Sequence, residues 1–160
     1  MDVFVKKLDK LVNGFLSWIT VIMLAVMSLV VFLQVIVRGV HGSIPWSTEL
    51  SQYLLIWCTF LGSALCVRKG SLVGLEIIYM IVPKKWGKQI ALCINILTSL
   101  FLLFLVVVGY NTSGLIIHQT SAVLKVSMGF MYASIPTGAF FMLINEFIVC
   151  YYLVKGEDAK

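Results

Sequence analysis

Four long stretches without a charged residue are the feature that most limits what this 160-residue chain can fold into. They cover residues 11–37, 50–67, 89–124 and 126–145. Apolar residues make up 61% of the chain and charged residues only 12%, so a soluble fold would not have enough polar surface to cover it. A bilayer core of about 30 Å is crossed by about 20 helical residues, so each stretch is long enough to form a transmembrane helix, the second only just.

The sequence therefore predicts an all-α polytopic membrane protein with four transmembrane helices, forming a single domain over residues 1–160. The expected spans are 14–37, 47–67, 89–117 and 129–153. Residues 1–13 alternate charged with apolar side chains and are expected to form a short amphipathic helix on the inner membrane surface. Pro136 is expected to kink the fourth span. The first apolar stretch is too long for a signal sequence, so we expect it to stay in the protein.

Residues 71–82 form a further apolar segment, which ends before Pro83 and Lys84. A helix of this length would reach only about 18 Å, which is too short to cross a bilayer. We expect it to be a short interfacial helix on or in the inner leaflet.

The distribution of lysine and arginine predicts the orientation of the spans. The N-terminal segment holds three of these residues, the loop before the third span holds five and the C-terminal segment holds two, against one in each remaining loop. Because cytoplasmic loops carry the excess of positive charge, both termini are expected in the cytoplasm of a bacterial inner membrane. The net charge of +5 is thereby explained without nucleic acid as a partner.

The residues that could hold a cofactor or a metal are few. The four cysteines lie within or at the ends of the spans and form no C-x-x-C pair, so they are expected to be free thiols rather than redox partners. His41 and His118 fall in or beside the outer loops; two such histidines could in principle hold a haem, but interfacial imidazoles explain them as well. We expect no enzyme activity, cofactor or metal.

Glu146 is the one acidic residue that falls deep within a span, toward the cytoplasmic end of the fourth helix. Intramembrane carboxylates are costly and are often functional, so Glu146 could serve transport. It could also reach the interface or pair with Arg68, Lys88 or a partner protein. The polar residues of the spans form no continuous stripe, which argues against a water-filled path through this chain alone.

Small residues recur at four-residue spacing in the fourth span, in the pairs Ser134 with Gly138 and Ala133 with Thr137. This spacing predicts close packing of the span around Pro136 against another helix, either within the chain or in a partner.

Several short motifs, in a fixed order, resemble the small membrane subunit of tripartite ATP-independent periplasmic (TRAP) transporters, the DctQ-like family. The motifs are Gln34-Val35-x-x-Arg38, Pro45-Trp46-x-x-Glu49, Tyr53, Trp57, Phe60-x-Gly62, Arg68-x-Gly70, Glu76, Pro83, Leu124-x-Val126-Ser127 and Tyr132-x-x-Ile135-Pro136-x-Gly138. The sequence departs from the family pattern at Ser71, where histidine is usual, and at Glu76, where aspartate is usual.

The resemblance implies an accessory subunit of a sodium-coupled importer of a small organic acid, which a periplasmic binding protein delivers. A large membrane subunit would carry the substrate and sodium sites, and this chain would brace it and help to dock the binding protein. The candidates for docking are the groups expected outside the membrane: Arg38, His41, Trp46, Glu49, His118 and Lys125. Glu49 could instead be stabilised by the positive end of the second helix, or pair with Arg38 or Lys125.

Two other classes of protein stay open at this point. One is an autonomous four-helix transporter or exporter, and the other is a membrane anchor that binds haem or a quinone. The sequence does not choose among substrates, since a C4-dicarboxylate, a sialic acid or another carboxylate fits equally.

Overall fold

The computed structural model describes residues 2–40, 42, 44–68 and 84–155, and these fold almost entirely into helices. The helices are α1 (Asp2–Gly39), α2 (Pro45–Arg68), α4 (Lys84–Ile116), α5 (Met128–Tyr132) and α6 (Ser134–Lys155). Four spans, the last of which joins α5 to α6, are long and apolar enough to cross a membrane. The predicted all-α membrane fold is confirmed. The interfacial helix expected over 71–82 lies outside the described residues.

The amphipathic segment and the first span are one continuous helix, α1, and not two elements as predicted. The pair Asn13-Gly14 does not break the helix, because Asn13 donates from its side chain to the backbone carbonyl (3.1 Å) and the carboxylate (2.8 Å) of Asp9, one turn earlier. A single glycine within a helix costs only about 1 kcal/mol, which this long helix tolerates.

The fourth span is interrupted at Ala133, where α5 ends and α6 begins. The cause is Pro136, which has no backbone N–H to donate to the carbonyl of Tyr132, four residues earlier. Nearby hydroxyls bond to the backbone at the interruption: Ser134 Oγ donates to the carbonyl of Met131 (2.6 Å) and Thr137 Oγ1 to that of Ala133 (2.6 Å).

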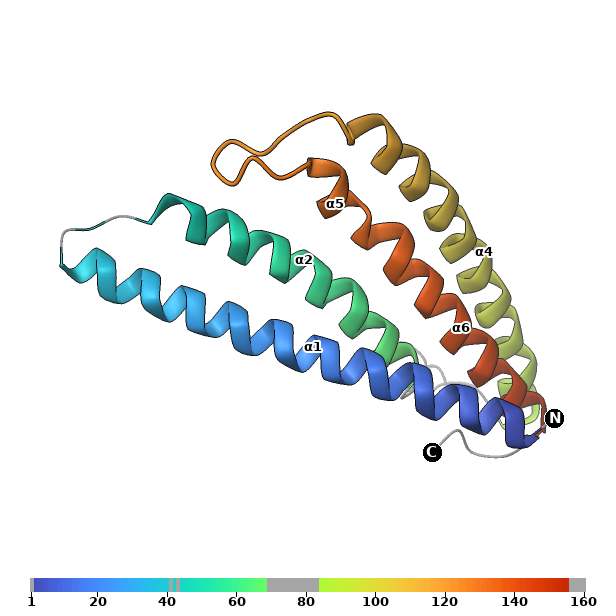
Figure 1. Cartoon of the computed structure of the whole chain (residues 1–160). Coiled ribbons are helices and arrows are strands. Elements are labelled where there is room, and N and C mark those ends of the chain that lie inside the picture. Colours follow the sequence, from blue (N-terminus) through green and yellow to red (C-terminus); the bar gives the residue numbers. More distant parts are fainter. Residues whose placement is uncertain (1, 41, 43, 69–83, 156–160) are drawn as a thin grey trace.

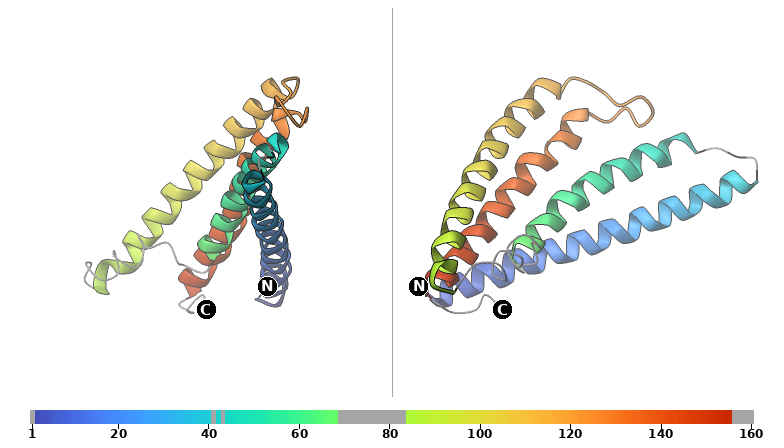
Figure 2. Two further views of the ribbon diagram at one scale, coloured as in Figure 1. Left: turned by 90° about the vertical axis from the view of Figure 1, so that its left-hand side faces the viewer. Right: turned by 180° about the vertical axis from the view of Figure 1, so that it is seen from behind.

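The four long helices lie in the order α1, α2, α6, α4 (Figure 1). The helix α6 packs against both α2 and α4, and α1 packs on α2. No contact joins α1 to α4 in the described part of the chain, and Figure 2 shows the beginning of α4 standing apart from that of α1. The helices therefore form an open, twisted layer and do not close into a bundle.

Small residues of α6 allow its close packing on both neighbours. A Cβ atom on Gly138 would lie 2.5 Å from Cβ of Phe60 on α2, and Ala139 is buried against Leu102 of α4. On the α4 side, a Cβ on Gly109 would lie 2.9 Å from Cδ of Pro136. The structure thus places the contact that the small-residue spacing predicts within this chain.

Candidate functional site

The layer has two distinct ends (Figure 1). We call the end at which α1 ends and α5 begins the loop end, and the end at which α1 begins and α6 ends the terminal end. The described candidate docking residues, Arg38, Trp46, Glu49, His118 and Lys125, belong to the loop end. The candidate ion-pair residues lie toward the terminal end.

At the loop end, residues 117–127 form a compact reversal that we call the 117–127 loop. Its two arms are joined by hydrogen bonds from Ser121 N to the carbonyl of Val126 (2.9 Å) and from Met128 N to that of Gln119 (2.8 Å). Lys125 has a positive φ of 58°, a conformation that is uncommon outside glycine and marks a tight turn. The 117–127 loop therefore has a defined, hydrogen-bonded conformation.

The carboxylate of Glu49 on α2 binds this loop. One oxygen accepts from Ser121 Oγ (2.7 Å) and from the backbone N–H of Leu124 (2.9 Å), and the other accepts from the N–H of Val123 (3.0 Å). Glu49 thus joins the beginning of α2 to loop groups that lie 72 to 75 residues further along the chain.

This contact corrects two expectations for Glu49. Because α2 begins at Pro45, whose fixed φ suits the first helical position, Glu49 lies beyond the first turn and not at the positive helix end. Its hydrogen-bond partners in the described structure are the loop groups, and neither Arg38 nor Lys125 forms an ion pair with it.

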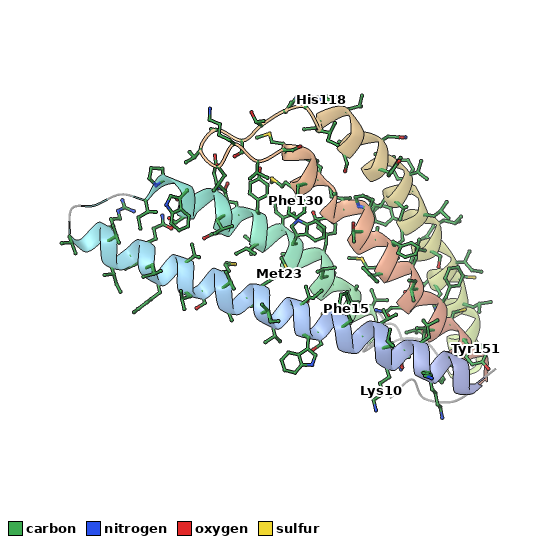
Figure 3. All side chains as sticks on the ribbon, in the orientation of Figure 1. Lys10, Phe15, Met23, His118, Phe130 and Tyr151 are labelled. Carbon is green, nitrogen blue, oxygen red and sulfur yellow. The ribbon has the colours of Figure 1, made fainter. Side chains whose placement is uncertain are left out.

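The other docking candidates occupy separate places at the loop end. Arg38 lies in the last turn of α1 and borders a shallow hollow. Gln34 and Thr48 also line this hollow, and Gln34 Nε2 donates a hydrogen bond to Thr48 Oγ1 (3.0 Å). Trp46 is exposed at the beginning of α2, and Lys125 is exposed in the 117–127 loop. His118 is exposed where α4 ends (Figure 3). His41 lies outside the described residues.

Toward the terminal end, Arg68 forms a two-point ion pair with Asp9 of α1. Nε donates to Oδ1 (2.6 Å) and an Nη nitrogen to Oδ2 (2.7 Å), and the guanidinium lies 5.5 Å from the ring centroid of Tyr152 on α6. Glu146, for which a pair with Arg68 was one of the possibilities, is not the carboxylate of this ion pair. Asp9 takes its place because the continuous α1 carries Asp9 alongside α2.

A buried amide pair lies next to this ion pair. Asn145 of α6 and Asn13 of α1 each donate to the other's side-chain oxygen at 3.0 Å, and Asn145 also donates to the carbonyl of Ala64 on α2 (2.7 Å). Asn145 is fully buried. Sequence reasoning missed this residue, although an amide inside an apolar span is itself a signal of an interhelical hydrogen bond.

Glu146 and Asn95 are two further buried polar side chains, and both polar side-chain atoms of Asn95 are without a hydrogen-bond partner in the described structure. Glu146 is 4% exposed on α6, and Asn95 is 2% exposed on α4. Among the described residues, no group of three histidine, cysteine or acidic side chains could hold a metal ion.

Two open apolar grooves run along the layer. One, of about 1140 Å³, is lined by α4, α5 and α6, and the other, of about 380 Å³, by α1, α2, α5 and α6. Phe130 lines both grooves (Figure 3). Its ring centroid lies 5.3 Å from that of Trp57. The described residues that line them include no lysine, arginine or histidine, the side chains that bind a carboxylate.

Fold and site together define a multi-pass helical membrane protein in which polar contacts serve to join helices. Residues 27–155 match the family of tripartite ATP-independent periplasmic transporters, DctQ component, and the chain belongs to this family. It is accordingly a component of a transporter and not an enzyme, in the inner membrane of a bacterium.

Two curated relatives agree with this family. The chain is 30% identical over 105 residues to a Haemophilus influenzae protein described as a TRAP transporter small permease, a match covering 65% of each chain. It is 24% identical over 151 residues to the sialic acid TRAP transporter small permease protein SiaQ of Vibrio cholerae, covering 94% of this chain and 87% of the relative.

Proposed function

We propose that this chain is the accessory small membrane subunit of a sodium-coupled TRAP transporter that imports a small organic acid. It braces the large membrane subunit, which carries the substrate and sodium sites, and receives a periplasmic binding protein at its loop end. The observation that carries the proposal is the family match over residues 27–155. The absence of a cationic side chain from the described lining of both grooves supports an accessory role.

The substrate class rests on the relatives. One is described as a small permease for sialic acid, a carboxylate sugar, so a sialic acid or another organic acid is the proposed cargo. Its selection would reside in the binding protein and the large subunit.

For orientation, we propose that the terminal end faces the cytoplasm. Lys6, Lys7 and Lys10 at the beginning of α1, and Lys84 at the beginning of α4, lie at this end, as the positive-inside rule expects. A cysteine at Lys84 should react with a membrane-impermeant reagent only from the cytoplasmic side. Labelling from the periplasm would instead mean that residues 69–83 cross the membrane.

The bracing role is tested by co-purification. A tagged copy of this chain should retain its cognate large subunit through detergent extraction, because the exposed apolar faces of α1 and α4 are available for helix packing. Recovery of this chain without the large subunit from cells that make both would contradict the proposal.

The docking role is tested by reversing charge at Lys125 and Arg38. Uptake by the reconstituted transporter should fall at limiting binding protein and recover at saturating binding protein, because exposed charges mainly affect the rate of encounter. An unchanged dependence on the concentration of binding protein would exclude docking through these groups.

A further inference from the structure

We propose that Glu49 is a positioning residue, whose carboxylate holds the 117–127 loop in the conformation that presents Lys125 to the binding protein. The inference rests on the proposed docking function, but it assigns to Glu49 a role that differs from direct contact with the partner. Glu49 would act through the loop.

Several hydrogen-bond donors of the 117–127 loop converge on one carboxylate. Ser121 Oγ and the backbone N–H groups of Val123 and Leu124 all donate to Glu49, from residues close before Lys125. Hydrogen bonds to an ionised carboxylate are roughly twice as strong as those between neutral groups. One side chain of α2 therefore fixes the segment that leads directly to Lys125.

The 117–127 loop provides few acceptors for its own backbone N–H groups. Its own backbone bonds join Ser121 to Val126 and Gln119 to Met128, at the base of the turn. The N–H groups of Val123 and Leu124 find their acceptor on Glu49. Lys125 has a positive φ, and a residue other than glycine keeps such a conformation only where the surrounding structure fixes it.

The contact depends on both oxygens of Glu49 acting as acceptors. A Glu49→Gln variant keeps the shape of the side chain but replaces one oxygen with an NH₂ group, which would face N–H donors of the loop. A Glu49→Asp variant keeps the charge on a shorter side chain. The proposal therefore predicts a larger effect for E49Q than for E49D.

The test uses the complex of both membrane subunits in liposomes with the purified binding protein. E49Q should raise the binding-protein concentration that gives half-maximal uptake by about three- to tenfold, with a smaller effect on the rate at saturation. E49D should raise this concentration much less. In the same complex, hydrogen exchange of the amides of 120–125 should be faster in E49Q. Gln52→Ala, an exposed position one turn along α2, is the matched control.

Hydrogen exchange and the half-maximal binding-protein concentration together distinguish failure of the positioning role from failure of the docking function. Unchanged exchange in E49Q would overturn the positioning role, whether or not Lys125→Glu alters uptake. Faster exchange with an unchanged half-maximal concentration would overturn docking through this loop, which belongs to the proposed function. Equal yields of the purified variant complexes establish that each has folded.

Discussion

Asn145 of α6 joins three helices, because its side-chain amide forms hydrogen bonds with Asn13 of α1 and with the carbonyl of Ala64 on α2. Each of these groups is expensive to leave unpaired in an apolar surrounding. Interhelical hydrogen bonds in membranes contribute about 0.6 kcal/mol on average and about 1.7 kcal/mol at most.

We therefore expect Asn145→Ala to lower the free energy of unfolding by about 1–2 kcal/mol, measured on the solubilised chain by thermal or denaturant unfolding. Asn111→Ala, at an exposed position of α4, should change it little. Equal effects of the two substitutions would show that the buried amide pair does not hold the helices together.

The ion pair between Asp9 and Arg68 joins α1 to α2 near the proposed cytoplasmic surface. Removing one partner of a buried pair is strongly destabilising, but both side chains are 15–18% exposed here, which reduces the cost. We expect Asp9→Ala to cost about 1–2 kcal/mol of unfolding free energy.

A charge swap gives the control for this pair. The double variant D9R/R68D should be more stable than either single variant, because it restores opposite charges at the same two positions. A double variant as unstable as the sum of the two single changes would show that the attraction between the two charges contributes nothing.

At the scale of whole elements, α6 depends on small side chains where it crosses α2. Gly138→Ala would place a Cβ atom 2.5 Å from Phe60 Cβ, so the two helices would have to move apart. Overpacking of this kind typically costs about 1–3 kcal/mol. Gly62→Ala on α2 is a matched control, since its Cβ would meet nothing within 4 Å.

We expect Gly138→Ala to lower the unfolding temperature of the solubilised chain and Gly62→Ala to leave it unchanged or raise it slightly, because alanine is the better helix former. A Gly138→Ala variant as stable as the original chain would mean that the approach of α6 to α2 is not tight.

The number and approximate place of the four spans could be predicted from the sequence, because uncharged stretches of about 20 residues have few alternatives to a transmembrane helix. The interruption before Pro136 was also foreseeable, since proline removes a backbone donor. The beginning of α2 at Pro45 was missed by two residues, and that error hid the true environment of Glu49.

The partners of the polar residues could not be predicted in the same way. Apolar periodicity does not say which turns of two helices face one another, so Arg68 could be named only as one possible partner of Glu146, and its pairing with Asp9 was not foreseen. The hydrogen bond that the N–H of Leu124 donates to Glu49 joins two motifs far apart in sequence, and no local pattern reveals it.

At the scale of the whole molecule, the layer is joined at specific points and open on its flanks. The helices α1 and α4 lie at its two edges and carry many exposed large apolar side chains, such as Trp18 and Leu115. Lipid or a second membrane protein must cover these faces in the bilayer. An open layer with an internally fixed order of helices suits a chain that braces a partner.

We propose that this chain serves transport only as part of a complex, and uptake by reconstituted liposomes is the decisive measurement. Liposomes would contain this chain alone, the large subunit alone or both, each with the binding protein, a labelled organic acid and a sodium gradient. The account predicts uptake only when both membrane subunits are present. Sustained uptake by this chain alone, or full uptake by the large subunit without it, would contradict the account.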